Sequence, residues 1–194
     1  AVAAPTDSPI IIINEIHADP DAINGDANGD GTVGTFNDEF VELVNISNEA
    51  IIMDGWELYD AAALRHLFPP GTSLAPGQAI VVFGGGIPNG AFGGSVVQTA
   101  TSGRLELNNN GDTVTLVDVP GTTIASYVYG SEGGDNQSLT RSPDIIGSPL
   151  IKHTLAPGSA GELFSPGMCL NGASFISCEL PPMADLVAGK TGPT

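Results

Sequence analysis

The sequence contains the apolar segment Ile10-Ile11-Ile12-Ile13-Asn14-Glu15-Ile16 and, after a loop rich in Asp, Asn and Gly, the segment Glu39-Phe40-Val41-Glu42-Leu43-Val44. Both segments are β-branched or alternate between apolar and polar residues, which is the pattern of strands and not of helices. We therefore expect two β-strands joined by an inserted loop.

The inserted loop carries oxygen-bearing side chains at every second position. Asp26, Asn28 and Asp30 match the first, third and fifth positions of a calcium-binding loop. Gly31 then permits a sharp turn, which would bring the backbone carbonyl of Thr32 toward the same point. The sequence thus predicts that these residues bind one Ca²⁺ as a cofactor.

The end of the loop departs from the helical calcium hand. The position that usually holds a bidentate Glu is Asn37, so we expect the next residue, Asp38, to supply the closing carboxylate. Because neither flank is helical, we do not expect a calcium sensor. The alternative is a turn rich in Asn and Asp that binds no metal, since these residues also dominate ordinary turns.

Composition restricts the class of protein. The 194 residues include 5 Lys or Arg and 22 Asp or Glu, which gives a formal net charge of −17. Such a charge repels polyanions, so we do not expect direct binding of nucleic acid. No stretch reaches the roughly 18 apolar residues of a membrane-spanning helix, so membrane insertion is not expected either.

Short apolar runs separated by Gly and Pro predict an all-β sandwich. Trp56, the only Trp, is expected to anchor its core. In Phe40–Val44 and Thr113–Val117 we expect one face to pack inward and the other to be partly solvated. The predicted strands are Ile10–Ile16, Glu39–Ile46, Ile51–Tyr59, His66–Phe68, Ala79–Phe83, Ser95–Ala100, Arg104–Leu107, Thr113–Val117, Ile124–Tyr129 and Ser138–Arg141.

Changes in pattern suggest the domain boundaries. Residues 1–9 are expected to be an N-terminal linker, residues 10–180 the sandwich, and residues 181–194 a tail or linker. Within the sandwich, the Pro-rich segment 142–180 is expected to form an irregular coat. Cys169 and Cys178 lie in this segment and would pair in an oxidising compartment. The alternative is two reduced thiols.

Five segments of the sequence are informative when taken in order: Ile11-Ile12-Ile13-Asn14-Glu15-Ile16, Asp38-Glu39-Phe40-Val41-Glu42-Leu43-Val44-Asn45, Met53-Asp54-Gly55-Trp56-Glu57-Leu58, Leu74-Ala75-Pro76-Gly77-Gln78-Ala79 and Leu107-Asn108-Asn109-Asn110-Gly111-Asp112-Thr113-Val114-Thr115-Leu116. Together they resemble the lamin tail domain family and in particular its bacterial branch. The resemblance spans most of residues 10–141 and implies an immunoglobulin-like sandwich without chemistry of its own. Bacterial members of this kind occur in secreted or cell-surface proteins, often beside extracellular nuclease or phosphoesterase domains, and carry a calcium-type insert after the first strand.

The sequence offers little support for catalysis. Nucleophile-elbow, dinucleotide and phosphate-loop motifs are absent. His17, with Asp19 and Asp21 nearby, could form a second metal or acid–base cluster, or it could be a solvated or hydrogen-bonded loop histidine.

Three glutamates near the loop are a second candidate for chemistry. Glu15, Glu39 and Glu42 could pair for acid–base work, as in glycoside hydrolysis, which would also need a sugar cleft. Otherwise these acids are expected to extend the calcium shell or face water.

The favoured hypothesis is a non-catalytic, calcium-stabilised interaction or targeting module of a secreted or cell-surface bacterial protein. Its partner would be a protein or another extracellular ligand. One alternative is an accessory domain of an extracellular nuclease or phosphoesterase whose catalytic part lies outside this chain. A carbohydrate-binding module is a further alternative.

Overall fold

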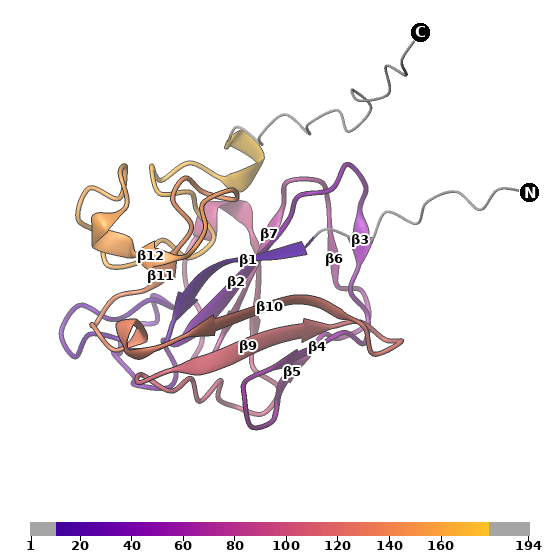
Figure 1. The fold of residues 1–194 in the computed structure, drawn as a ribbon, viewed down its shortest axis with the longest axis horizontal. Helices are drawn as coiled ribbons and strands as arrows, with labels where there is room; N and C mark the ends of the chain where they lie inside the picture. The colour runs from indigo at the N-terminus through magenta and orange to yellow at the C-terminus, as the bar shows by residue number, and fades with distance from the viewer. Residues whose placement is uncertain (1–10, 179–194) are drawn as a thin grey trace, which may run out of the picture.

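The structure is a computed structural model that describes residues 11–178. The linker predicted over 1–9 and the tail predicted over 181–194 lie outside these residues. Within them the fold is all-β, as the sequence predicts, and consists of a six-stranded, a four-stranded and a two-stranded sheet (Figure 1). The strands are β1 (Ile11–His17), β2 (Phe40–Asn45), β3 (Ile51–Ile52), β4 (Glu57–Tyr59), β5 (Leu64–Leu67), β6 (Ser73–Leu74), β7 (Ala79–Phe83), β8 (Val96–Thr99), β9 (Asp112–Val117), β10 (Thr123–Tyr129), β11 (Leu139–Thr140) and β12 (Ile151–Lys152).

The two larger sheets form the layers of a sandwich. The six-stranded sheet has the order β12-β11-β1-β2-β7-β8, and the four-stranded sheet has the order β10-β9-β4-β5. Neighbouring strands are antiparallel except β7 and β8, which pair in parallel. Antiparallel sheets in two layers are consistent with an immunoglobulin-like fold.

The main core lies between these two layers. Val41 and Leu43 of β2 and Ile80 of β7 meet Val114 and Leu116 of β9 there, and all five are buried. Trp56 belongs to the same cluster and is 7% exposed, which confirms its prediction as a core anchor.

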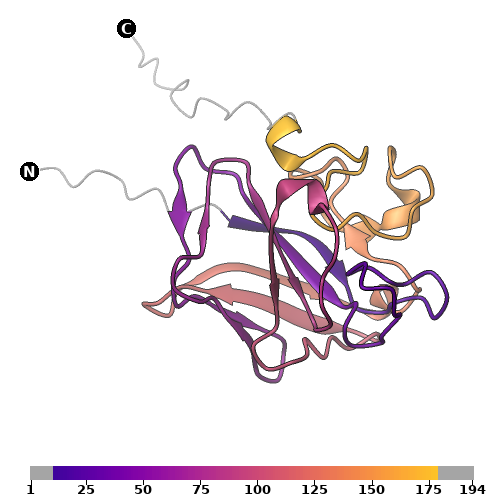
Figure 2. The same ribbon diagram turned by 180° about the vertical axis from the view of Figure 1, so that it is seen from behind.

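The six-stranded sheet is also covered on its other face. Residues 142–178, which we name the C-terminal coat, lie on the side of β1 and β2 away from β9 and β10 (Figures 1 and 2). Cys169 and Phe175 of the coat pack against Val44 of β2. The expectation that Phe40–Val44 has a partly solvated face was therefore wrong, because every residue of β2 is buried. For β9 the expected alternation of buried and half-buried residues is confirmed.

Most predicted strands are present, with four differences. The segment Ile51–Tyr59 is divided into β3 and β4 by a turn at Gly55, whose φ is 73°. Residues Arg104–Leu107 are not a strand, and Glu106 has a φ of 52°, which interrupts extended backbone. The strands β6 and β12 were missed, because pairs of two residues have no detectable period.

Helical structure in the described part of the chain consists of short 3₁₀ turns: η1 (Phe92–Gly94), η2 (Ser131–Gly133), η3 (His153–Leu155) and η4 (Phe175–Ser177). Within residues 11–178 no helix has the length and apolar character needed to cross a membrane.

Candidate functional site

The acidic loop (residues 18–39) joins β1 to β2 and lies at one end of the sandwich, at the left of Figure 1 and the right of Figure 2. It is held against the segment that follows β7. The carbonyl of Asn28 accepts the backbone N–H of Asn89 at 2.8 Å. The side-chain amide of Asn28 donates to the carbonyl of Gly85 at 3.3 Å, and the Asp30 carboxylate accepts the N–H of Ile87 at 3.2 Å.

Glycine at position 86 makes this close contact possible. A Cβ atom there would lie 2.4 Å from the Asn28 side-chain nitrogen and 2.5 Å from Asp30 Oδ2, too close for any larger residue unless these two side chains move and lose their present contacts. The φ of Gly86 is 74°, a conformation that glycine adopts readily. The segment after β7 is thus shaped to receive the loop.

Asp38 connects two parts of the predicted calcium loop by hydrogen bonds to the backbone of Asn28 and of Gly34. One of its carboxylate oxygens accepts the N–H of Asn28 at 3.0 Å and the other accepts the N–H of Gly34 at 2.7 Å. The side chain is fully buried. Burial, and then the charges of Asp26 and Asp30, raise the pKa of Asp38, whereas the two N–H donors lower it. Asp38 is therefore close enough to Asp26 and Asp30, two of the other predicted calcium ligands, for their charges to affect its pKa.

The other predicted ligands form a chain of local hydrogen bonds. Asn28 Oδ1 accepts the N–H of Asp30 at 2.9 Å, and Asp30 Oδ1 accepts the N–H of Thr32 at 2.9 Å. Asp26 Oδ2 accepts the N–H of Gly31 at 3.0 Å, but Asp26 Oδ1 is buried and has no hydrogen-bond partner. A buried carboxylate oxygen without a partner is costly unless a water or cation satisfies it.

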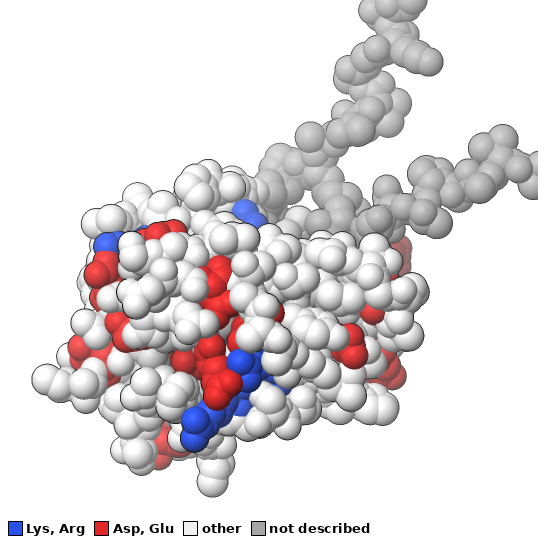
Figure 3. All heavy atoms as spheres, turned by 60° about the horizontal axis from the view of Figure 1, so that its bottom comes forward, with Lys and Arg blue, Asp and Glu red and all other residues white. Residues whose placement is uncertain are grey.

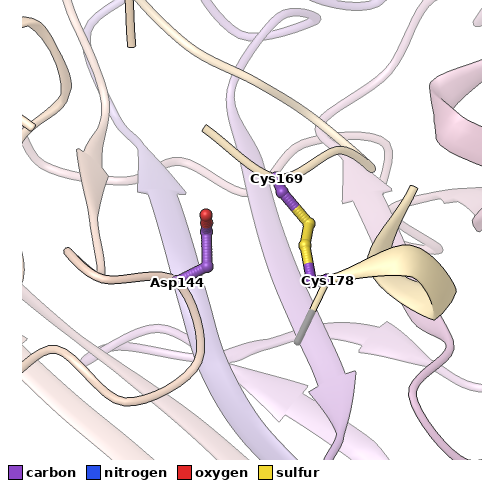
Figure 4. Close-up of side chains that lie close together, drawn as sticks. All are labelled: Asp144, Cys169 and Cys178. Atoms are coloured by element: carbon purple, nitrogen blue, oxygen red, sulfur yellow. A yellow bond between two sulfur atoms is a disulfide. The ribbon is translucent and has the colours of Figure 1, made fainter. Parts of the chain in front are cut away.

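The carboxylates of the loop are not drawn tightly together. Within residues 11–178, the one group of three His, Cys, Asp or Glu side chains whose ligand atoms all lie within 4.8 Å of one another is Asp144, Cys169 and Cys178 (Figure 4). Cys169 and Cys178 form a disulfide, as predicted from their proximity in the sequence. Sulfur in a disulfide is not a thiolate ligand, so this group is not a metal site while the bond is intact.

Two buried glutamates attach the coat to the sheet. Glu15 of β1 and Glu42 of β2 are direct cross-strand neighbours, and both side chains are fully buried. Glu15 accepts hydrogen bonds from the hydroxyls of Ser138 (2.6 Å) and Ser165 (2.9 Å). Glu42 accepts the N–H of Gly167 at 2.6 Å. Burial, and then the charge of Glu15, raise the pKa of Glu42 well above its ordinary value.

A serine and a histidine meet beside Glu15. The Ser165 hydroxyl lies 3.0 Å from His153 Nε2, and His153 Nδ1 lies 2.7 Å from the carbonyl of Glu162. The Ser165 N–H donates to Glu15 at 3.0 Å, so it is not free to stabilise an oxyanion. This arrangement fastens the coat and does not assemble a nucleophile. Sequence reasoning missed it because Ser138, His153 and Ser165 share no motif with Glu15.

His17 does not join a metal or acid–base cluster. It is fully buried at the end of β1, with its ring centroid 5.4 Å from that of Phe40 and 5.2 Å from that of Phe164. Burial lowers the pKa of His17 to about 3. Asp21 instead accepts the N–H of Ile23 in a local turn, and Asp19 accepts a hydrogen bond from the side-chain amide of Asn109. The expectation of a solvated loop residue was wrong, because His17 is buried at the end of a strand, and no cluster with Asp19 and Asp21 forms among the described residues.

The expectation that Glu15, Glu39 and Glu42 face water was wrong, whereas Glu15 and Glu42 do lie side by side as a pair. None faces water, because each is at most 1% exposed. Glu39 accepts the N–H of Leu107 at 3.3 Å, away from the Glu15–Glu42 pair. Burial raises the pKa of Glu39 to about 8. Alternation along β1 and β2 could not reveal this, because both faces of the sheet are covered.

Acidic side chains predominate over basic ones on the face in Figure 3. The four described basic residues are engaged. Arg65 pairs with Asp60 and Glu106, and Lys152 pairs with Asp135. Arg104 lies 4.5 Å from the centre of the Phe36 ring, and Arg141 donates to the carbonyls of Ile13 and Gly147.

The fold and these contacts define an all-β, sandwich-like module in which residues 11–178 assemble no recognisable catalytic centre. The sequence model of the Lamin Tail Domain matches residues 4–131, and the chain belongs to this family. The resemblance stated from the sequence is thereby confirmed at the level of the family. A lamin tail domain is a non-catalytic module. No curated protein matches the chain.

Proposed function

We propose that this chain is a calcium-stabilised, non-catalytic interaction or targeting module of a secreted or cell-surface bacterial protein. Asp26, Asn28, Asp30, the carbonyl of Thr32 and Asp38 would hold the ion. When bound, calcium supplies positive charge that fixes the loop, and it takes part in no reaction.

The observation that carries the proposal is the buried, unpartnered Oδ1 of Asp26. It lies in a loop whose Asp38 carboxylate is buried near two further acids. Hard oxygen ligands suit calcium, and each carboxylate oxygen can accept a second contact besides its hydrogen bond. The residues present therefore fit the ion, although the loop would have to draw its carboxylates closer to bind it.

Thermal melting tests the proposal. The protein is first treated with a chelator and then melted with and without calcium. At about 100 times the dissociation constant, calcium should stabilise the fold by about 2.7 kcal/mol, which for a chain of this size raises the melting midpoint by roughly 5–10 °C. Asp30→Ala should abolish the rise.

Asp21→Ala is the matched control, because Asp21 lies in the same acidic loop but outside the proposed ligand set. Its carboxylate accepts the N–H groups of Ile23 and Asn24. This variant should keep the calcium-dependent rise. Equal midpoints for the chelated and calcium-loaded wild type would reject the calcium site.

An extracellular location is supported by the Cys169–Cys178 disulfide, since such bonds persist in oxidising compartments. The engaged basic side chains and the net charge of −17 favour a partner that is not a polyanion. Hydrolysis of DNA or a phosphoester by the isolated chain, assayed with calcium, magnesium or zinc, would contradict the non-catalytic role.

A further inference from the structure

A pocket of about 410 Å³ lies between three segments that are distant in the sequence. Its walls come from the acidic loop, the segment 90–92 and the C-terminal coat. Small-molecule sites commonly enclose about 300–1,000 Å³, so this pocket is large enough for one. Most of it is built by the coat, beyond the residues that the family model matches. The apolar lining includes Ala27, Phe92, Phe164, Met168 and Leu170.

The walls are held in place by close backbone contact between η1 and the coat. A Cβ atom on Gly93 would lie 2.4 Å from the carbonyl oxygen of Gly167, and one on Gly167 would lie 2.3 Å from that of Phe92. The hydroxyl of Ser95 also donates to the Gly167 carbonyl at 2.8 Å. Phe92 has a φ of 42°, an uncommon conformation for a residue with a side chain. The pocket is thus largely formed before any ligand arrives.

The side-chain polar atoms of His153 and Ser165 in the wall already have hydrogen-bond partners. Both ring nitrogens of His153 have partners, and the Ser165 hydroxyl lies within hydrogen-bond distance of His153 and Glu15. The wall therefore offers an entering molecule mainly apolar contact, including two phenylalanine rings. A ligand body without hydrogen-bonding groups fits this environment.

One charged side chain lines the pocket. Glu162 is exposed, and its carboxylate makes no hydrogen bond or ion pair with the described residues. No described Lys or Arg lines the pocket, and the chain as a whole carries a net charge of −17. The electrostatic complement of this carboxylate is a cation.

We propose that this pocket binds a small organic cation, with its apolar body between Phe92, Phe164 and Met168 and its ammonium group at Glu162. The site is separate from the calcium ligands, although Ala27 belongs to the acidic loop. The proposed cation site and the proposed calcium site can therefore be tested and rejected separately.

The test compares three probes that share one apolar body: 4-phenylbutylammonium, 4-phenylbutan-1-ol and 4-phenylbutanoate. Each is titrated into the full chain with calcium present, and binding is followed by calorimetry and by the NMR signals of the phenylalanine rings. The ammonium probe should bind about two- to five-fold more tightly than the alcohol, as expected for an exposed ion pair. The carboxylate should bind most weakly.

Three variants test the site, and the first two separate the effect of the local charge from that of the net charge. Glu162→Gln should remove the advantage of the ammonium probe over the alcohol and leave the affinity for the alcohol unchanged. Glu49→Gln removes the same charge from another exposed glutamate, which lies outside the pocket lining, and should preserve the advantage. Ala91→Trp places a large side chain at an exposed lining position and should weaken the alcohol and ammonium probes at least ten-fold.

Failure of all three probes to saturate would overturn the proposal. It would also be overturned if the ammonium preference survived in Glu162→Gln, because the attraction would then come only from the net charge. Saturable binding that leaves the ring signals of Phe92 and Phe164 unchanged would place the ligand elsewhere. If no probe binds the pocket but calcium still raises the melting midpoint, the cation site is rejected and the calcium site is retained.

Discussion

At the scale of single residues, burial determines the behaviour of the titratable groups near the acidic loop. His17 lies among aromatic rings and not beside a metal, and burial lowers its pKa to about 3. Glu42 is affected in the opposite sense, because burial and the nearby Glu15 favour its neutral form. Neither effect follows from residue type, since it depends on what covers β1 and β2.

The depressed pKa of His17 predicts a loss of stability in acid. The unfolded chain binds a proton on this histidine near pH 6.5, whereas the folded chain does so only near pH 3. Stability from this group is therefore full above about pH 6.5 and falls as the pH drops toward 3, by up to about 1.4 kcal/mol per pH unit.

Urea unfolding at pH 7 and pH 5 checks this prediction. His17→Phe keeps an aromatic ring between Phe40 and Phe164 but cannot titrate. Its free energy of unfolding should fall less between the two pH values than that of the wild type. Because each protein is compared with itself, a cost of fitting the larger ring does not affect the result. Equal losses in both proteins would show that His17 does not carry the effect.

At the scale of elements, β1 and β2 present one face to the sandwich core and the other to the coat. Glu15 and Glu42 are adjacent in the register and both accept hydrogen bonds from coat residues. Two buried carboxylates thus connect the sheet to a segment more than 120 residues away. The coat depends on these polar contacts as well as on apolar packing.

Glu42→Ala tests this connection. It leaves the N–H of Gly167 and the side-chain amide of Asn14 without their acceptor. Each of these two unsatisfied buried groups costs about 1–3 kcal/mol, so the free energy of unfolding in urea should fall by roughly 2–6 kcal/mol. Hydrogen exchange at the Gly167 amide should become faster. Glu49→Ala, at an exposed position, is the control and should change stability by about 0.5 kcal/mol or less. A similar effect of both substitutions would show that Glu42 does not hold the coat.

The elements that could be predicted are those with a strong local pattern. β1, β2, β7, β9 and β10 have β-branched or alternating residues bounded by turns, and each lies within about one residue of its predicted bounds. Arg104–Leu107 has the same alternation, but Glu106 leaves the extended region and the segment remains irregular. A two-residue strand such as β12 is defined by its pairing with a neighbouring strand, here β11, so no local sequence pattern predicts it.

The candidate calcium residues could be chosen from spacing, because a metal loop is local in sequence. The structure adds the contact of this loop with Gly85 and Gly86, which lie far along the chain. The role of Glu15 and Glu42 in attaching the C-terminal coat could not be predicted from spacing. It depends on a cross-strand register and on a coat that contacts the sheet from the far end of the described residues.

At the scale of the whole molecule, the chain has an excess of negative charge, and its six-stranded sheet is covered on both faces. The net charge of −17 opposes compaction, and a bound divalent cation would relieve part of this repulsion in the loop that carries Asp26, Asp30 and Asp38. The acidic loop contacts the segment after β7 and contributes to the pocket beside the coat. Calcium would therefore stabilise more than the loop itself.

The most direct test of the calcium site is calorimetric titration of the chelator-treated chain with calcium. We expect one calcium ion per chain, with a dissociation constant of roughly 10⁻⁵–10⁻³ M. Asp26→Asn preserves the shape of the side chain but removes its charge, and it should weaken binding at least ten-fold. Absence of binding at millimolar calcium, or an unchanged affinity in Asp26→Asn, would contradict the proposed calcium site.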